Sequence, residues 1–104
     1  MDESKFDALA AAALTRIEGA LEQIDDLEFE VGAGGVIEVE FDDGAVMVIN
    51  RHGAAREIWV ADKSGGFHFR PQDGIWINTR DGEELFAALG RLIGAHLGRK
   101  VSLD

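Results

Sequence analysis

Apolar residues recur at spacings of three and four near the start of the chain, which is the pattern of a helix with one buried face. Asp2 or Ser4 can cap this helix, and the periodicity predicts about six turns. Gly19 lies inside it and costs about 1 kcal/mol relative to alanine, which a pattern of this length tolerates. The predicted buried stripe consists of Phe6, Leu9, Ala10, Ala13, Ile17, Leu21 and Ile24.

After residue 26 the apolar residues recur at every second position, which indicates β-strands. The segment LEFEV points Leu27, Phe29 and Val31 inward, and VIEVEF at 36–41 repeats the scheme with its glutamates outward. Further strands are predicted at 45–50, 57–61, 67–70 and 75–78, each bounded by Gly, Asp or Pro. Such short connections predict an antiparallel meander.

A second helix is predicted near the end of the chain, where Asp81 is followed three residues later by Glu84 in the manner of a capping box. Its predicted buried stripe is Leu85, Leu89, Leu92, Ile93, His96 and Leu97. We therefore expect an α+β fold: a two-layer sandwich with an antiparallel sheet of about six strands and both terminal helices packed on one face. Residues 1–104 form one predicted domain.

One strand places a tryptophan beside a charged residue. In EIWVA, Ile58 and Val60 alternate with Glu57, Trp59 and Ala61, so Trp59 is predicted to stand on the uncovered face of the sheet. Cross-strand neighbours can shelter such a side chain. Alternatively, an exposed tryptophan ringed by polar groups is typical of an interface anchor.

The charge is concentrated in the first part of the chain, where residues 1–44 hold 13 acidic and 2 basic residues, against 7 and 8 in residues 45–104. Such an acidic surface disfavours nucleic acid and anionic membranes, and favours cations or basic protein surfaces. The chain has no cysteine, which excludes disulfides and thiolate metal sites. It has no apolar run of membrane-spanning length, and its acidic start lacks the features of a signal peptide, so we expect a cytoplasmic protein.

Several segments resemble the frataxin family, most closely its bacterial branch, CyaY. They are GGVIEVEF at 34–41, VINR at 48–51, IWVADKSGGFHF at 58–69 and IWINTRDGEELFAALGRLI at 75–93. The resemblance covers nearly the whole chain. It implies an iron-binding accessory protein of iron–sulfur cluster assembly, acting as iron donor, sensor or regulator on the cysteine desulfurase and the scaffold protein.

The resemblance also implies two sites. A partner-binding surface would include Asn50, Arg51 and Trp59, with His68 expected beside Trp59. An acidic ridge, the expected metal site, matches Glu18, Glu22, Asp25, Asp26, Glu28 and Glu30.

Carboxylates in this ridge are hard ligands that suit weakly and reversibly bound iron, but equally manganese, calcium or magnesium. Glu18 and Glu22 lie one helical turn apart, and like charges this close are stabilised by a cation. A solvated acidic face without metal is the other interpretation. The alternative function is accordingly a metal-independent interaction module that regulates the desulfurase by electrostatic docking. We expect a monomer, with metal-dependent oligomers left open.

Enzymatic activity is the weakest interpretation. No serine lies in a nucleophile-elbow motif, and no histidine pair has zinc spacing. Ferroxidase activity would need a di-iron site, and the first helix carries no Glu-x-x-His pair. His96 lies on the buried stripe of the second helix, so we expect it to be a core or boundary residue and not a ligand.

Overall fold

The computed structural model describes residues 2–103. Along the chain, one helix precedes and a second helix follows a run of six strands. Helix α1 spans Glu3–Leu21 and α2 spans Leu85–Leu97, and a short 3₁₀ turn, η1, covers Ala33–Gly35. The strands are β1 (Leu27–Val31), β2 (Ile37–Phe41), β3 (Val46–His52), β4 (Glu57–Asp62), β5 (Gly65–Gln72) and β6 (Ile75–Asn78).

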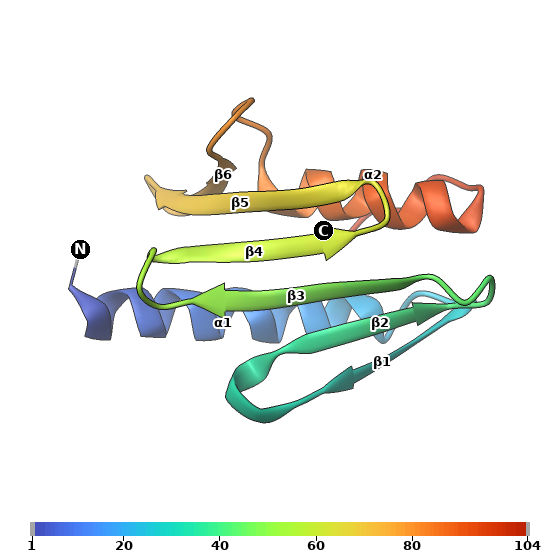
Figure 1. Cartoon of the computed structure of the whole chain (residues 1–104), viewed down its shortest axis with the longest axis horizontal. Helices are drawn as coiled ribbons and strands as arrows, with labels where there is room; N and C mark the ends of the chain where they lie inside the picture. Colours follow the sequence, from blue (N-terminus) through green and yellow to red (C-terminus); the bar gives the residue numbers. More distant parts are fainter. Residues whose placement is uncertain (1, 104) are drawn as a thin grey trace.

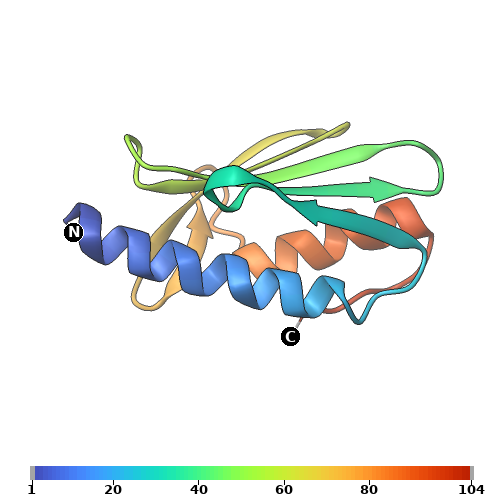
Figure 2. The ribbon, with the colours of Figure 1, turned by 90° about the horizontal axis from the view of Figure 1, so that it is seen from below.

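The six strands form one antiparallel sheet in the order of the sequence, β1 to β6, so the predicted meander is confirmed. Figure 2 shows the two helices lying in a single layer on one side of the sheet, which leaves the other side open. We call that second side the open face. The predicted two-layer α+β fold is therefore the one observed. None of the helices among residues 2–103 combines the length and hydrophobicity needed to cross a membrane.

Helix α1 begins where the capping pattern predicts. Asp2 is its N-cap, and its Oδ1 accepts a hydrogen bond from the Lys5 backbone N–H at 2.8 Å. The helix ends at Leu21, about a turn earlier than the apolar spacing predicts, so Ile24 packs against the core from the following loop. Leu14, which the predicted stripe omits, is buried on the same helix face.

The start of α2 differs from the prediction. Its N-cap is Glu84, whose carboxylate accepts hydrogen bonds from the backbone N–H groups of Phe86 and Ala87. Asp81 instead accepts from the N–H of Glu83, within the turn that precedes the helix. Both acidic residues can cap a helix, and the sequence alone does not distinguish a start after Asp81 from one after Glu84.

The core lies between the helices and the facing side of the sheet, as the alternation predicts. One inward position is not buried: Val31, at the end of β1, pairs with the buried Ile37 and so faces the helix side, but it is 45% exposed. Leu27 and Phe29 on the same strand are only partly buried. Strand β1 forms an edge of the sheet, so its inner face is covered less completely than that of β2, where Ile37, Val39 and Phe41 are buried.

The segment after α2 returns along that helix and packs on two of its glycines. A Cβ atom on Gly90 would lie 2.8 Å from the Val101 carbonyl oxygen, and one on Gly94 would lie 2.7 Å from the Arg99 carbonyl oxygen. This close approach brings Leu103 into the core, where it is 2% exposed. Because these two residues have no side chains, the backbone of the C-terminal segment can pack directly against α2.

We predict that Gly90→Ala and Gly94→Ala each destabilise the fold by about 1–3 kcal/mol, because the new methyl group collides with backbone that must move away. Gly19→Ala is the matched control: a Cβ there meets no atom within 4 Å, so the variant should gain up to about 1 kcal/mol from helix propensity. Urea unfolding of the three variants measures the difference. An equal gain in the free energy of unfolding for all three variants would show that the close backbone contacts at Gly90 and Gly94 do not affect stability.

Candidate functional site

The centre of the open face carries a row of three side chains from neighbouring strands. Asn50 on β3 pairs with Trp59 on β4, and Trp59 pairs with His68 on β5. All three stand opposite the helix layer, because their strand neighbours Ile49, Ile58 and Phe69 point into the core. The structure thus brings three of the four predicted partner-binding residues into one row and places Trp59 on the open face.

Arg51 does not join this row. It pairs with Ile58, a fully buried residue, and so points to the helix side of the sheet. There its Nη1 lies 3.5 Å from the Oδ1 of Asp7 on α1. The predicted grouping of Arg51 with Trp59 on one surface is wrong, because adjacent residues of a strand face opposite sides.

The indole ring of Trp59 is held between two imidazoles. Its ring is stacked on His52 with centroids 3.9 Å apart and on His68 with centroids 4.5 Å apart. The His52 ring is itself oriented by the Ala55 backbone N–H, which donates to its Nδ1 at 3.2 Å. Parallel stacking on both faces leaves the indole few alternative rotamers, so its orientation is fixed within the folded protein.

Glu57 holds the Trp59 indole in place by a hydrogen bond. Its carboxylate accepts a hydrogen bond from Trp59 Nε1 at 2.8 Å and another from Arg70 Nε at 2.7 Å. His68 Nδ1 lies 3.6 Å from the same carboxylate. Although it lies on the open face, Glu57 is only 5% exposed, because these larger side chains cover it.

The environment of Glu57 favours its ionised form. Burial alone raises the pKa of this carboxyl, but the hydrogen bonds from Trp59 and Arg70 and the positive charge of Arg70 outweigh it and hold the pKa below its ordinary value. Glu57 therefore remains a carboxylate at neutral pH and keeps both donors in place.

The predicted acidic ridge runs from the end of α1 through the loop into β1. Its members are exposed apart from the half-buried Glu18. Asp26 is engaged, because Arg99 donates from Nη1 to its Oδ2 at 2.8 Å and from Nη2 to the Asp25 carbonyl oxygen at 3.0 Å. Among residues 2–103, no three His, Asp or Glu side chains are close enough together to hold a metal ion. The ridge is thus an open anionic surface without a preformed chelating site.

Two further acidic residues extend this surface onto the open face. Glu38 and Glu40 on β2 lie directly opposite Glu30 and Glu28 on β1. The four carboxylates surround a shallow depression of about 100 Å³. Alternation in the sequence places all four outward, but only the strand register shows that they face one another in pairs.

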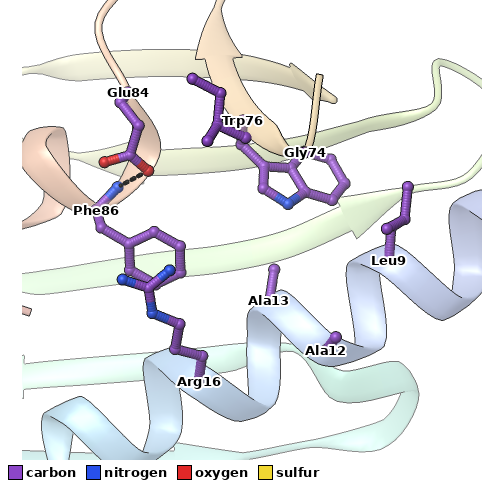
Figure 3. Close-up of a pocket in the computed structure, with 9 residues that line it drawn as sticks. Leu9, Ala12, Ala13, Arg16, Gly74, Trp76, Glu84 and Phe86 are labelled. Carbon is purple, nitrogen blue, oxygen red and sulfur yellow. Dashed lines mark hydrogen bonds between the residues drawn. The ribbon is translucent and has the colours of Figure 1, made fainter. Parts of the chain in front are cut away.

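A pocket of about 200 Å³ lies on the opposite side of the molecule, between α1, β6 and the start of α2 (Figure 3). Its walls are mainly apolar, and its two charged side chains have structural roles. Glu84 caps α2, and the Arg16 guanidinium lies 3.7 Å from the centre of the Phe86 ring. The pocket is smaller than typical small-molecule sites and brings together no nucleophile, base or metal ligands.

His96 is a core residue, as its place on the helix stripe predicts. Its side chain is 2% exposed, stacks on Phe41 with centroids 4.0 Å apart and places Nε2 3.2 Å from Asp62 Oδ2. Burial raises the pKa of Asp62, but hydrogen bonds from Ser64 and His96 outweigh this and lower it. The pair ties α2 to the β4–β5 turn.

Comparison with known proteins identifies the family to which the fold and the sequence belong. A family model described as a frataxin-like domain matches residues 1–99. The chain belongs to the frataxin family. The resemblance inferred from the sequence is thereby confirmed.

Relatives of this frataxin cover most or nearly all of its length. It is 49% identical over 104 residues to "Iron-sulfur cluster assembly protein CyaY" of Dechloromonas aromatica, with 99% of each chain covered. A protein of the same name from Ralstonia nicotianae is 47% identical over 97 residues, covering 89% of this chain and 86% of that one. The solved structure of frataxin from Psychromonas ingrahamii has a TM-score of 0.91 at 26% identity, covering 100% of this chain and 99% of that one.

The sequence did not predict three features of the open-face site of this frataxin. Glu57 is buried, His52 stacks on Trp59, and Arg70 donates a hydrogen bond to Glu57. The alternation of side chains along each strand could have predicted that these residues share one face of the sheet. Glu57 and His52 are cross-strand partners, and both share the face of Trp59. A carboxylate two positions from an open-face tryptophan is within reach of the indole N–H.

We predict that Glu57→Gln makes the free energy of unfolding depend less on pH in the acidic range. Because the folded-state pKa of Glu57 lies below the ordinary value of 4.5, the ionised carboxylate stabilises the fold above about pH 4.5, and this contribution is lost as the pH falls through the folded-state pKa. The variant should be about 1–2 kcal/mol less stable at pH 7, since charge-assisted hydrogen bonds are lost near a partly solvated arginine. It should then lose less stability on acidification than the wild type.

Urea unfolding between pH 7 and about pH 3 tests this prediction. Asp62→Asn is the matched variant, because the pKa of Asp62 is also lowered and its contribution disappears in the same direction. Profiles for wild type and Glu57→Gln that run parallel would show that Glu57 is not coupled to folding.

Proposed function

We propose that this frataxin is a non-enzymatic accessory protein of iron–sulfur cluster assembly that docks on the cysteine desulfurase and its scaffold protein. The observation that carries the proposal is the full-length similarity to proteins named for iron–sulfur cluster assembly, at up to 49% identity among those compared. For such a function we expect the protein to work in the cytoplasm, as a monomer.

The geometry supports docking by two separate surfaces. The stack of His52, Trp59 and His68 offers a rigid aromatic anchor on the open face, which is the kind of residue that dominates binding energy in interfaces. The acidic ridge offers long-range attraction to a basic groove, which speeds encounter and orients the partners. Because the surfaces lie on different parts of the sheet, a partner that engages both is fixed in one orientation.

Iron enters the proposal as cargo or effector, bound weakly at the ridge. The exposed carboxylates suit hard cations that keep most of their water, and repulsion among them favours any bound cation. The alternative, a metal-independent module that regulates the desulfurase by electrostatic docking, draws support from the open geometry of the ridge and from the Arg99 contact to Asp26. Iron titration with and without the desulfurase separates the two: binding that needs the partner favours the alternative.

For the aromatic anchor, we predict that Trp59→Ala weakens binding to the desulfurase–scaffold complex by about 2 kcal/mol, the cost typical of a central aromatic residue. The fold should lose far less than the about 3–5 kcal/mol of a buried aromatic truncation, since the indole lies outside the core. Ile75→Ala, at an exposed apolar position near the far edge of the sheet, is the control.

The dependence of binding on salt separates the two surfaces. It should be nearly unchanged in Trp59→Ala and clearly reduced when ridge carboxylates are neutralised, because only the ridge contact is electrostatic. Full binding by Trp59→Ala would contradict the docking role, and ready unfolding would make Trp59 a core residue.

For the metal, we predict that neutralising four ridge acids removes most of the paramagnetic broadening that Fe²⁺ or Mn²⁺ causes in NMR spectra. The ridge variant carries Glu18→Gln, Glu22→Gln, Asp25→Asn and Asp26→Asn. The control variant removes four charges elsewhere: Asp42→Asn, Asp43→Asn, Asp73→Asn and Asp81→Asn. Broadening centred on His52 or His68, or lost equally in both variants, would refute the ridge assignment.

A further inference from the structure

The two edges of the sheet differ in how their backbone groups are engaged. The outer edge of β6 is partly paired by the turn before α2, because Ile77 bridges to Glu84 and the Asn78 N–H donates to the Glu83 carbonyl oxygen at 2.8 Å. The outer edge of β1 has no strand beside it in the part of the chain that the structure describes (Figure 1). Such an edge is a template for pairing with another chain.

The hairpin geometry shows which groups of β1 point outward. The Gly32 N–H donates to the Val36 carbonyl oxygen at 2.8 Å, so these two residues form a hydrogen-bonded pair. Hydrogen-bonded and non-hydrogen-bonded pairs alternate along an antiparallel ladder. Glu30 and Glu28 therefore bond inward to β2, and the residues whose N–H and C=O groups face the free edge are Leu27, Phe29 and Val31.

The side chains flanking this edge differ between the two faces of the sheet. On the helix side, an open groove of about 400 Å³ runs along the strand, lined by Leu21, Glu22, Ile24, Leu27, Glu28, Phe29 and Glu30. Val31 continues its apolar side and is 45% exposed. On the open face, the strand carries Glu28 and Glu30, each with a second glutamate directly opposite. Like charges in that arrangement destabilise the hairpin, and basic side chains beside them would relieve the repulsion.

We propose that the free edge of β1 accepts an extended segment of a protein partner as an additional strand, in which basic and aliphatic residues alternate. Backbone hydrogen bonds to Leu27, Phe29 and Val31 hold the segment, its aliphatic side chains enter the helix-side groove, and its basic side chains meet the glutamates. A second copy of this chain does not fit, because it would bring its own glutamates against Glu28 and Glu30. The proposal rests on the docking function for the source of the segment.

The probe is a capped six-residue peptide of alternating lysine and valine, titrated into isotope-labelled protein and followed by NMR. We expect amide shift changes centred on residues 27–31. Two N-methylated versions keep every side chain and charge: one is methylated on the valine nitrogens and the other on the lysine nitrogens. In an antiparallel addition only the valine N–H groups face β1, and in a parallel addition only the lysine N–H groups do.

One methylated peptide should therefore bind about tenfold more weakly than the other, and its identity gives the strand direction. Equal binding of both methylated peptides would overturn the proposal, since charge alone would then explain the interaction. Shift changes centred away from β1, the groove residues 21–24 and the facing residues 37–41 of β2 would overturn it as well.

A substitution in the protein tests the same edge. Val31→Pro removes an N–H that points outward, so it should leave the ladder to β2 intact. We expect about tenfold weaker peptide binding than for Val31→Thr, which keeps the N–H, with similar melting temperatures for the two variants. Equal peptide affinity in the two variants would contradict strand addition.

The same pair of variants separates this proposal from the docking function. If both bind the desulfurase–scaffold complex as the wild type does, and the peptides show no selectivity, strand addition fails while docking stands. If wild-type protein does not bind the complex at all, the docking function fails, and the peptides still decide whether the edge accepts a strand.

Discussion

The burial of one sheet face against α1 and α2 decides which way each strand residue of this protein points. Ile49, Ile58 and Phe69 must face the helices, so the residues beside them in sequence face water. The cross-strand register then aligns Asn50, Trp59 and His68, and it sends Arg51 to the helix side. The candidate docking row is thus a direct consequence of the hydrophobic core, because a shift of one residue in any central strand would dismantle both at once.

Glu57 adds rigidity to that row. A flexible exposed tryptophan loses side-chain entropy when it binds, and this loss weakens the complex. Here the loss has already occurred on folding, because the indole is hydrogen-bonded to Glu57 and enclosed by two imidazoles. Arg70 also makes this part of the open face different in charge from the glutamates of β1 and β2. The sheet therefore presents two chemically distinct regions, which favours a single binding orientation.

Periodicity in the sequence was sufficient to predict the helices and the strands, because covered and uncovered faces impose different spacings on apolar residues. The short connections between the strands predicted their order. Periodicity also placed Trp59 and His96 correctly. Arg51 was grouped with Trp59 on the family resemblance alone, whereas strand phase puts the two side chains on opposite faces of the sheet. The burial of Glu57 could not be predicted, since it depends on which large side chains from β5 lie over it. The cap of α2 was ambiguous because Asp81 and Glu84 both suit that role.

The sequential strand order has a consequence for the folding pathway. Every strand pairs with its neighbour in the chain, so each hairpin closes only a short loop and loses little chain entropy. The two helices are the exception: they lie at opposite ends of the sequence and meet where Arg16 contacts Phe86. Hairpins can form locally, but the helix layer closes only when nearly the whole chain is in place. Completion of the core is therefore the most non-local step in folding, and non-local contacts are the ones whose formation costs the most chain entropy.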